Sequence, residues 1–435
     1  MRRVKDWLDG HMAIMAPSEA PEIYCRWAGI AAIAAALQRK CYHMWDRRIY
    51  PNMYIALIGG PGTRKGTAID PIRDYITHLG VPMSHDSGSR QAFITALDES
   101  RQGNGPDDEH ASLTLIAGEL VKFLGFGDME FIVELCDLWD CPNPHHYRVV
   151  GRETNKIPAT WVNIFGGATP EGFRESILKF AGVSGLASRF LFIFCDKRSK
   201  LVPLPGLQDE CTVSDLKHDL ENINALSGAF RDTEEFRNAY EEWYLRTERL
   251  EEDESDPLQY YRTRRSTHLR KLCMILSASR GGDMIINKGD FYRGLDILEE
   301  AELYMPFALK PESRLDTARF IGAVERLVIE LKTVQWTNLH VAFGKDLSGE
   351  ELAKILALLK RKGTVDYYYS KKLGNEKTLE TMVVYHVGER NVRNIKFDPP
   401  ISERNLINNP LGLYDKIDLG NFGPKTLDEK PDGGD

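Results

Sequence analysis

Apolar and polar positions along the chain predict segments of different kinds. Residues 1 to about 45 have a helical pattern, and the alanine-rich run at 22–40 predicts a buried helix that ends in basic residues before Pro51. From 53 to 200, short apolar runs alternate with helical ones. Alternation of this kind predicts a parallel sheet flanked by helices, so we expect an α/β core that follows a helical prefix.

The rest of the chain has other patterns. Residues 211–310 carry long charged helices and predict an all-helical second domain. Residues 320–388 predict two or three helices and then two strands around the polar turn 371–377. The final residues are rich in Asn, Pro, Gly and Asp and predict a loose tail. The expected divisions are a prefix at 1–50, an α/β core at 51–205, a helical domain at 206–312, a C-terminal module at 313–392 and a flexible tail at 393–435.

Composition and charge narrow the class of protein. The chain has 435 residues, of which 42% are apolar and 28% charged, enough for two or three domains with real cores. It lacks an apolar run of about 18 residues and a signal-peptide core, so we expect a soluble, cytoplasmic protein without a membrane partner. Seven scattered cysteines predict reduced thiols. The net charge of -8 argues against a generally basic surface, so any nucleic-acid contact is expected to be local.

A glycine-rich stretch directly follows the apolar run at 53–58. It is similar to the phosphate-binding pattern Gly-x-x-x-x-Gly-Lys-Ser/Thr, except that Arg64 stands at the second glycine and Gly66 at the hydroxyl. In a strand-turn-helix context, backbone N–H groups cradle phosphate and a lysine reaches the terminal phosphates. The alternative is a glycine-rich turn with a surface lysine. The predicted nucleotide-binding loop consists of Gly59, Gly60, Pro61, Gly62, Thr63, Arg64, Lys65, Gly66 and Thr67.

Three polar residues stand at the ends of predicted strands farther along. The strand 112–120 contains Glu119, a candidate for polarising an attacking water, although Gly118 stands where a metal-associated Asp is usual. Thr169 follows a second strand, where its hydroxyl either contacts a γ-phosphate or caps the helix that follows. Arg189 precedes a third strand and either projects across a subunit contact or pairs with a carboxylate of its own fold.

The order of these segments resembles the AAA+ ATPase core of phage and plasmid replication proteins. It looks like the family, often fused to primase-polymerase domains, that carries a Gly-Thr/Ser-Arg-Lys loop preceded by Pro-Asn-x-Tyr. The Ser-Arg-Phe segment is also similar to the arginine-finger motif of minichromosome maintenance helicases. The resemblance covers about residues 15–310 and makes 206–312 a helical lid domain. It implies ATP and Mg²⁺ as cofactors, with the roles of phosphate lysine for Lys65, catalytic glutamate for Glu119, sensor 1 for Thr169 and trans-acting arginine finger for Arg189.

Two consequences follow for metal ligation and assembly. Because the hydroxyl at 66 and the Asp at 118 are missing, the candidate magnesium ligands are Thr67 and Glu119. An arginine finger contributes a factor on the order of 10³ to 10⁵ to turnover and, when supplied in trans, makes activity depend on assembly. We therefore expect a homo-oligomeric ring, a hexamer in the first instance.

A basic turn precedes the predicted sensor strand. Residues 147–150 and 158–164 are predicted as two strands around the turn 151–156. Related ring helicases grip DNA in the pore with a hairpin at this point, so the resemblance implies contacts to single-stranded DNA there. The alternative is a solvated basic loop. The candidate residues are Arg148, Arg152 and Lys156.

Two further sets of residues, one near this turn and one in the helical domain, are candidates for other roles. Zinc is disfavoured, because structural sites use two separated pairs of ligands and adjacent histidines rarely ligate together. This set comprises Cys136, Cys141, His145 and His146. In the helical domain, the resemblance makes Arg270 and Lys271 the sensor 2 candidates, without a choice between them; the alternative is a solvated helix face.

The module at 313–392 has a helix opened by a capping box of Ser348 and Glu351, with predicted core positions Leu352, Ile355, Leu356 and Leu359. Helices followed by a hairpin resemble a winged helix, which binds duplex DNA or serves as a protein contact. The candidate phosphate contacts are Lys354, Lys360, Arg361, Lys362, Lys371, Lys372 and Lys377.

Together these features predict an ATP-hydrolysing, ring-forming DNA translocase or helicase in the replication of a phage or mobile element. The alternative is an ATP-dependent replication organiser or helicase loader that binds DNA without unwinding it. A nucleotide-binding protein that has lost hydrolysis is the third possibility, which Gly118 keeps open. We expect primer synthesis to come from a separate primase or polymerase.

Overall fold

The computed structural model of the chain describes residues 2–84, 90–103, 105, 109–124, 128–147, 155–174, 176, 185–204, 210–247, 258–309, 316–343, 347, 349–361, 363–373 and 378–386. The chain forms two compact units, Met1–Pro311 and Glu312–Asp435. The predicted tail at 393–435 lies outside the described residues.

The first unit is built on a mainly parallel sheet, which confirms the predicted α/β class. Its strand order is β10-β3-β9-β6-β4, and β5 pairs antiparallel with β6 at the edge. Every residue of the four long strands is buried, as expected for a sheet covered on both faces. The strands are β3 (Tyr54–Ile58), β4 (Met83–Ser84), β5 (Arg101–Gln102), β6 (His110–Ala117), β9 (Thr160–Ala168) and β10 (Phe190–Phe194).

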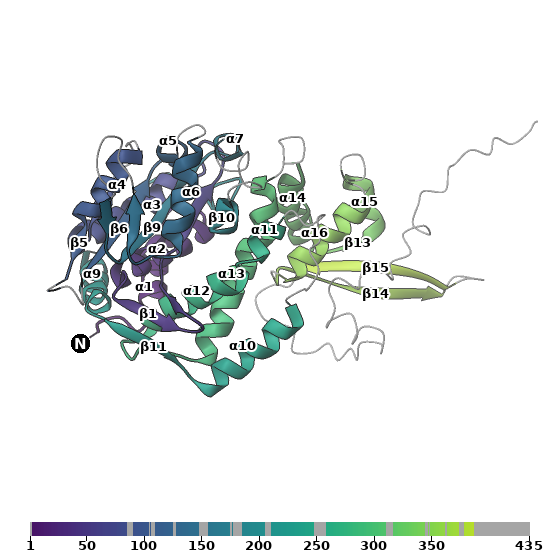
Figure 1. Cartoon of the computed structure of the whole chain (residues 1–435). Helices are drawn as coiled ribbons and strands as arrows, with labels where there is room; N and C mark the ends of the chain where they lie inside the picture. Colours follow the sequence, from purple (N-terminus) through teal and green to yellow (C-terminus); the bar gives the residue numbers. More distant parts are fainter. Residues whose placement is uncertain are drawn as a thin grey trace, which may run out of the picture. The chain divides into compact units, whose positions relative to one another are not determined.

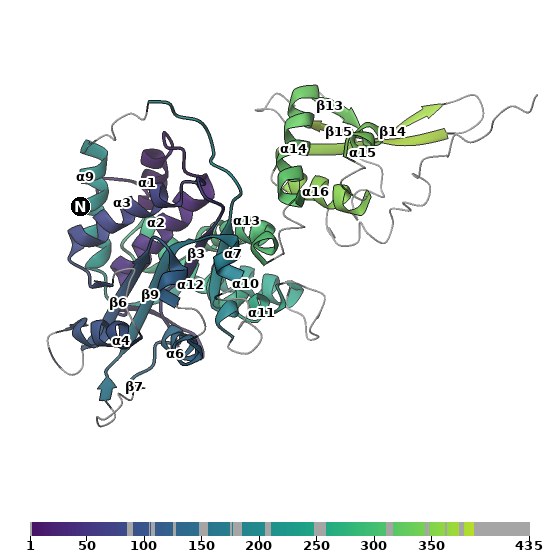
Figure 2. The ribbon, with the colours of Figure 1, turned by 90° about the horizontal axis from the view of Figure 1, so that it is seen from above.

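Helices cover both faces of this sheet (Figures 1 and 2). One face carries α1 (Trp7–Met15), α2 (Glu22–Leu37), α3 (Lys65–Leu79) and α9 (Glu210–Asn224). The other face carries α4 (Arg90–Glu99) and α6 (Met129–Trp139). The short helices α5 (Leu120–Leu124) and α7 (Pro170–Phe173) follow β6 and β9, and the 3-10 turn η2 (Leu186–Ser188) precedes β10. Helix α2 is the predicted buried prefix helix, and 14 of its 16 residues are buried.

The expectation that residues 211–310 form an all-helical domain is wrong. Two short strands of this segment join a second sheet of order β12-β11-β1-β2, in which β11 runs parallel to β1 from the prefix. These residues belong to the first unit, where α12 packs on α2 and α13 on β10. The strands are β1 (Cys41–Met44), β2 (Arg48–Ile49), β11 (Gly228–Asp232) and β12 (Ile285–Ile286). The helices are α10 (Glu234–Thr247), α11 (Gln259–Arg262), α12 (Arg265–Arg280) and α13 (Lys288–Leu309).

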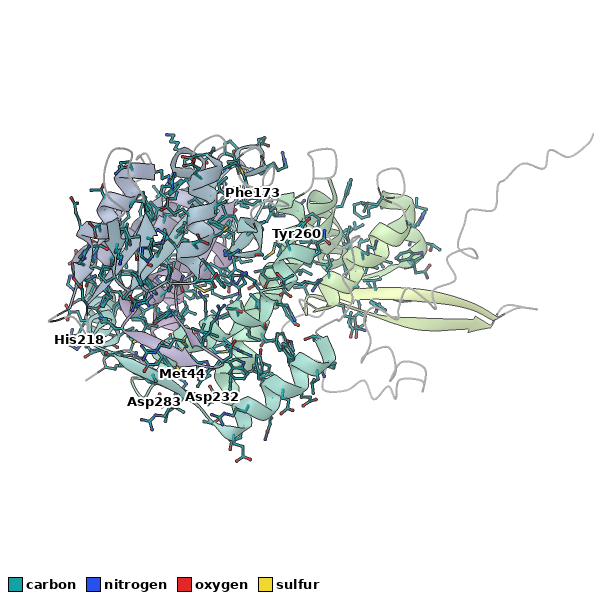
Figure 3. The ribbon with its side chains drawn as sticks, viewed as in Figure 1. Met44, Phe173, His218, Asp232, Tyr260 and Asp283 are labelled. Atoms are coloured by element: carbon teal, nitrogen blue, oxygen red, sulfur yellow. The ribbon has the colours of Figure 1, made fainter. Side chains whose placement is uncertain are left out.

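The two sheets lie toward opposite ends of the first unit. Figure 3 shows Met44 of β1 and Asp232 of β11 at one end, and Phe173 of α7 at the other. Phe173 packs against Phe192 of β10, with ring centroids 4.6 Å apart.

All seven cysteines are free thiols. Within the described residues, no helix is long and apolar enough to cross a membrane.

The described residues of the second unit form three helices and a three-stranded antiparallel sheet of order β13-β15-β14. The predicted core positions of its third helix, Leu352, Ile355, Leu356 and Leu359, are buried, which confirms the face that was predicted. Strand β13 is an addition that the sequence pattern did not predict. The elements are α14 (Asp316–Leu331), β13 (Thr333–Gln335), α15 (Trp336–Phe343), α16 (Gly349–Arg361), β14 (Val365–Leu373) and β15 (Thr378–His386).

Candidate functional site

The glycine-rich loop connects β3 to α3 at the carboxyl edge of the parallel sheet. Gly62 and Arg64 have positive φ angles of 84° and 62°. The positive φ angle at Arg64 explains why the phosphate-binding pattern has glycine at the position before the lysine, because a left-handed backbone is strained for a residue with a Cβ atom. Arg64 is therefore a real departure from the pattern, and the loop still adopts the left-handed turn.

The loop is packed on one side and open on the other. A Cβ atom at Gly59 would lie 2.5 Å from both the carbonyl oxygen of Cys195 and the hydroxyl of Tyr24. Gly60, Gly62 and Gly66 instead face open space. Helix α3 begins after Arg64 without a side-chain cap, so the first-turn N–H groups have no intrahelical acceptor. A helix start of this kind attracts anions.

Lys65 reaches back over its own loop. Its Nζ donates to the carbonyl oxygens of Gly59 and Gly60, the latter at 3.2 Å, and lies 3.4 Å from Thr63 Oγ1. The Thr63 hydroxyl closes the turn by donating to the Gly60 carbonyl at 2.9 Å. Burial lowers the pKa of Lys65, while the carboxylates of Glu119 and Glu171 act against the shift. The Lys65 amine therefore lies against the loop, where it can contact an anion bound there.

Glu119 lies beside Lys65 at the same edge of the sheet. Gly167 of β9 lies between Lys65 and the backbone directly before Glu119, because a Cβ atom at Gly167 would be 2.9 Å from the Gly118 carbonyl and 3.3 Å from Lys65 Cδ. One carboxylate oxygen of Glu119, Oε1, is buried and has no hydrogen-bond partner within the described residues. A buried oxygen without a donor is costly, so this atom calls for a ligand or an ordered water.

Thr169 directly follows β9 at this edge and caps α7. Its Oγ1 accepts a hydrogen bond from the Gly172 N–H at 3.2 Å, so the capping alternative describes the contact in this structure. Only the hydroxyl oxygen takes part in that bond, and its hydrogen remains a donor for another acceptor. Lys65, Glu119 and Thr169 thus lie on the segments that follow the carboxyl ends of three adjacent strands, β3, β6 and β9.

Zinc and magnesium place different demands on the residues that would hold them. Within the described residues, no group of three or more His, Cys, Asp or Glu side chains is placed to hold a metal ion. Magnesium differs, because it usually takes only one or two protein ligands together with phosphate oxygens and water. The partnerless Oε1 of Glu119 fits that role, and Thr67 is exposed on the first turn of α3.

Arg189 lies at the opposite, amino edge of the sheet, directly before β10. Its Nη2 pairs with Asp140 at 3.2 Å and its Nη1 donates to the Gly185 carbonyl at 3.1 Å. Only 12% of the side chain is exposed. Of the two alternatives for this arginine, pairing within its own fold is the one present here. Arg47 and Arg264 also pair with Asp140, at 3.3 and 3.7 Å, so three arginines share one carboxylate.

The two sensor 2 candidates are buried away from the phosphate loop of their own chain. Lys271 donates to Asn52 Oδ1 at 2.6 Å, at the amino end of β3. Arg270 lies between the rings of Trp45 and Tyr240, 3.4 and 4.4 Å from their centroids. The solvated-face alternative is also wrong, because both side chains are buried in the packing between α12 and its neighbours.

The predicted basic hairpin exists with different boundaries. Its strands are β7 (His145–Tyr147) and β8 (Asn155–Ile157), and Figure 2 shows β7 at the periphery of the unit. The prediction of a hairpin strand at 158–164 is wrong, because residues 160–164 belong to β9 of the buried sheet. The apolar pattern of the sequence does not indicate where a hairpin ends and the next strand begins. Lys156 is exposed, whereas Arg148 and Arg152 lie outside the described residues.

The basic residues of the second unit are only partly described. Lys360 is paired with Asp366 at 2.7 Å and lies 4.2 Å from the centroid of the Tyr367 ring. Lys354 is exposed on α16. The side chains of Arg361, Lys371 and Lys372, together with the residues Lys362 and Lys377, lie outside the described part of the chain.

Two supporting residues were missed by the sequence reasoning. Tyr24 of α2 places its hydroxyl 2.7 Å from the Ile58 carbonyl and 3.0 Å from that of Cys195, at the start of the phosphate loop. Asn52 accepts from Lys271 and donates to the Trp139 carbonyl at 3.0 Å. The Pro-Asn-x-Tyr string before the loop was the available signal for Asn52; no local pattern marks Tyr24.

Comparison of the chain with protein-family models and with curated proteins found no match. The geometry of the site is therefore the basis for a functional assignment.

Proposed function

We propose that the chain is a P-loop ATPase with an AAA+ core that acts as a ring-forming DNA translocase or helicase. The observation that carries the proposal is the meeting of Lys65, Glu119 and Thr169 at the carboxyl ends of β3, β6 and β9. In open α/β sheets, ligands bind outside the carboxyl ends of the strands. A lysine, a carboxylate and a hydroxyl there are the groups that nucleotide hydrolysis uses.

Each residue of this site has a part in the proposed reaction. The open N–H groups of the loop and Lys65 bind the phosphates, and Thr169 offers its hydroxyl hydrogen to the terminal phosphate. Glu119 orients the attacking water and takes its proton. Magnesium, when bound with ATP, would neutralise charge on the phosphates, with Glu119 and Thr67 as the protein groups nearest to that role.

The DNA part of the proposal rests on two elements. Exposed Lys156 belongs to the β7–β8 hairpin, a shape suited to contacting the backbone of a single strand. The helices and antiparallel hairpin of the second unit support the proposal of a winged helix, and exposed Lys354 lies on its third helix. Phosphate contacts of this kind position nucleic acid without reading its sequence.

The test is an ATPase and strand-displacement assay on the full chain. We expect wild type to hydrolyse ATP with Mg²⁺ and to unwind a forked duplex. Lys65→Ala should lose nucleotide binding, and Glu119→Gln should bind ATP with turnover reduced about 100-fold or more. Lys122→Ala, which removes an exposed lysine from α5, is the matched control and should keep full activity.

The outcomes separate the candidate functions. A wild type that binds no nucleotide would exclude the ATPase. Hydrolysis on DNA without any strand displacement would favour an organiser or loader over a helicase. Binding of ATP without hydrolysis would point to a protein that has lost the chemical step.

A further inference from the structure

Glu19, in the loop between α1 and α2, joins segments that are far apart in the sequence. Its carboxylate accepts hydrogen bonds from Arg64 Nε at 2.6 Å, from the Val202 N–H at 3.0 Å and from Arg198 Nη1 at 3.3 Å to each oxygen. Its backbone carbonyl accepts from the Ser199 N–H at 3.1 Å. The hydrogen bond from Val202 leads the contacts that lower the pKa of Glu19, so this carboxyl group is ionised at neutral pH.

Arg64 is the member of the phosphate loop that Glu19 holds. It lies directly before Lys65, at a left-handed position where glycine would be free of strain. Its guanidinium carries a permanent charge on a long side chain. That charge is directed to Glu19, whereas Lys65 contacts the loop carbonyls. An anion bound at the loop therefore competes with Glu19 for Arg64.

The other partners of Glu19 belong to the segment 196–204, which follows β10. Polar contacts hold this segment to the loop before α2: Ser199 bonds to Glu19 and Ala20, and Lys200 bonds to the Ala16 carbonyl. Its leucines contribute little packing, because Leu201 and Leu204 are 71% and 90% exposed. The position of the segment therefore depends on the charges and hydrogen bonds around Glu19.

We propose that Glu19 is a positioning residue. When a nucleoside triphosphate binds, Glu19 releases Arg64 to the phosphates and then holds the segment 196–204 more tightly. The inference rests on the proposed function, since it takes the loop as the nucleotide site. At present Oε2 of Glu19 is shared between Arg64 and Arg198. Once phosphates take Arg64, this oxygen is left to Arg198 alone. Nucleotide occupancy is thereby transmitted to an exposed surface segment.

Binding of a non-hydrolysable ATP analogue with Mg²⁺ to the full chain tests the exchange. Glu19→Gln keeps an acceptor for Val202 but removes the charge, so it should raise affinity about fivefold by releasing Arg64. Arg64→Gln should lower affinity, and Glu19→Gln should have no further effect in the Arg64→Gln background. Glu22→Gln, which removes an exposed carboxylate three residues away that pairs with Arg26, is the matched control and should leave affinity unchanged.

Hydrogen exchange of the peptide 196–204 supplies a readout that a purely structural role would not move. Exchange should slow when wild type binds the analogue and stay unchanged in Arg64→Gln. If wild type binds the analogue but Glu19→Gln leaves affinity unaltered, or the peptide does not respond, this inference is overturned and the proposed function stands. If wild type binds no nucleotide, both are overturned.

Discussion

Lys271 shows what the interior does to a single charged side chain. It is 2% exposed, donates to Asn52 Oδ1 and to the Asn52 carbonyl at 2.6 and 3.0 Å, and lies 3.9 Å from the centroid of the Trp139 ring. These contacts favour the ammonium form, yet burial outweighs them and lowers the pKa of Lys271 from 10.5 to about 7. Lys271, which the resemblance suggested for nucleotide sensing, is thus part of the buried core at the amino end of β3 in this chain.

The shifted pKa predicts a pH-dependent stability. Between pH 7 and about 10.5 the unfolded chain keeps the Lys271 proton and the folded chain does not, so the free energy of unfolding rises with pH in this window. Against Lys271→Met, wild type should gain at most about 1.4 kcal/mol per pH unit from pH 7 to 10. Denaturant titrations at several pH values measure the difference, with Lys217→Met, which removes a partly exposed lysine of α9 that pairs with Asp74, as control. A difference that is flat with pH would contradict the prediction.

The position of a single residue can be predicted from the sequence when the pattern that identifies it is local. Glu119 and Thr169 follow the ends of their strands as predicted, because each stands within two residues of an apolar run, and Lys65 opens the helix after the glycine-rich loop as predicted. Arg270 and Lys271 were misplaced, because a helical pattern identifies charged positions but not which tertiary neighbours surround them. Glu19 carries no motif at all, since its partners are brought together only by the fold.

At the scale of elements, the phosphate loop is supported by α2 and by the end of β10. Gly59 is enclosed by Tyr24 of α2 and by the Cys195 carbonyl after β10, whereas Gly66 in the first turn of α3 is exposed to open space. The same substitution should therefore act with opposite signs at two positions of one loop.

Gly59→Ala places a methyl group against a backbone carbonyl that cannot rotate away, so it should destabilise the fold by about 1–3 kcal/mol. Gly66→Ala removes a flexible residue from a helix and should stabilise it by up to about 1 kcal/mol. Thermal unfolding of both variants beside wild type measures the two shifts. Equal effects at the two positions would contradict the account of the loop.

Elements with a contiguous pattern were predictable, and those that depend on distant partners were not. The buried helix α2, the strand-loop-helix of β3 and α3, and the helices α15 and α16 each stand in one uninterrupted run of sequence. Strand β11 has five residues, of which only Phe230 is buried, and its partner β1 lies far away in the chain. Such a strand has almost no local signal, because its stability comes from pairing across a long separation.

At the scale of the whole first unit, the two ends of one sheet hold different parts of the proposed machinery. Lys65 follows β3 at the carboxyl edge, and Arg189 precedes β10 at the amino edge. The two strands are parallel neighbours, with Phe190 opposite Tyr54 and Phe194 opposite Ile58. Since a strand rises about 3.3 Å per residue, the two edges are about 13 Å apart. Arg189 therefore lies far from the phosphate loop of its own chain, and under the proposed function it would act on the nucleotide of another copy.

This separation predicts complementation between two inactive variants. Lys65→Ala chains keep Arg189 but cannot bind nucleotide, whereas Arg189→Ala chains keep the loop but lack the finger, and each alone should lose a factor of about 10³ or more in turnover. If copies mix at random in a ring, about a quarter of the interfaces join an intact loop to an intact Arg189, so ATPase activity should return in the mixture. Asp140 must release Arg189 for this contact, and Asp140→Asn should weaken that hold. A mixture no more active than the sum of its parts, or an Arg189→Ala variant with the wild-type rate, would exclude the trans-acting role.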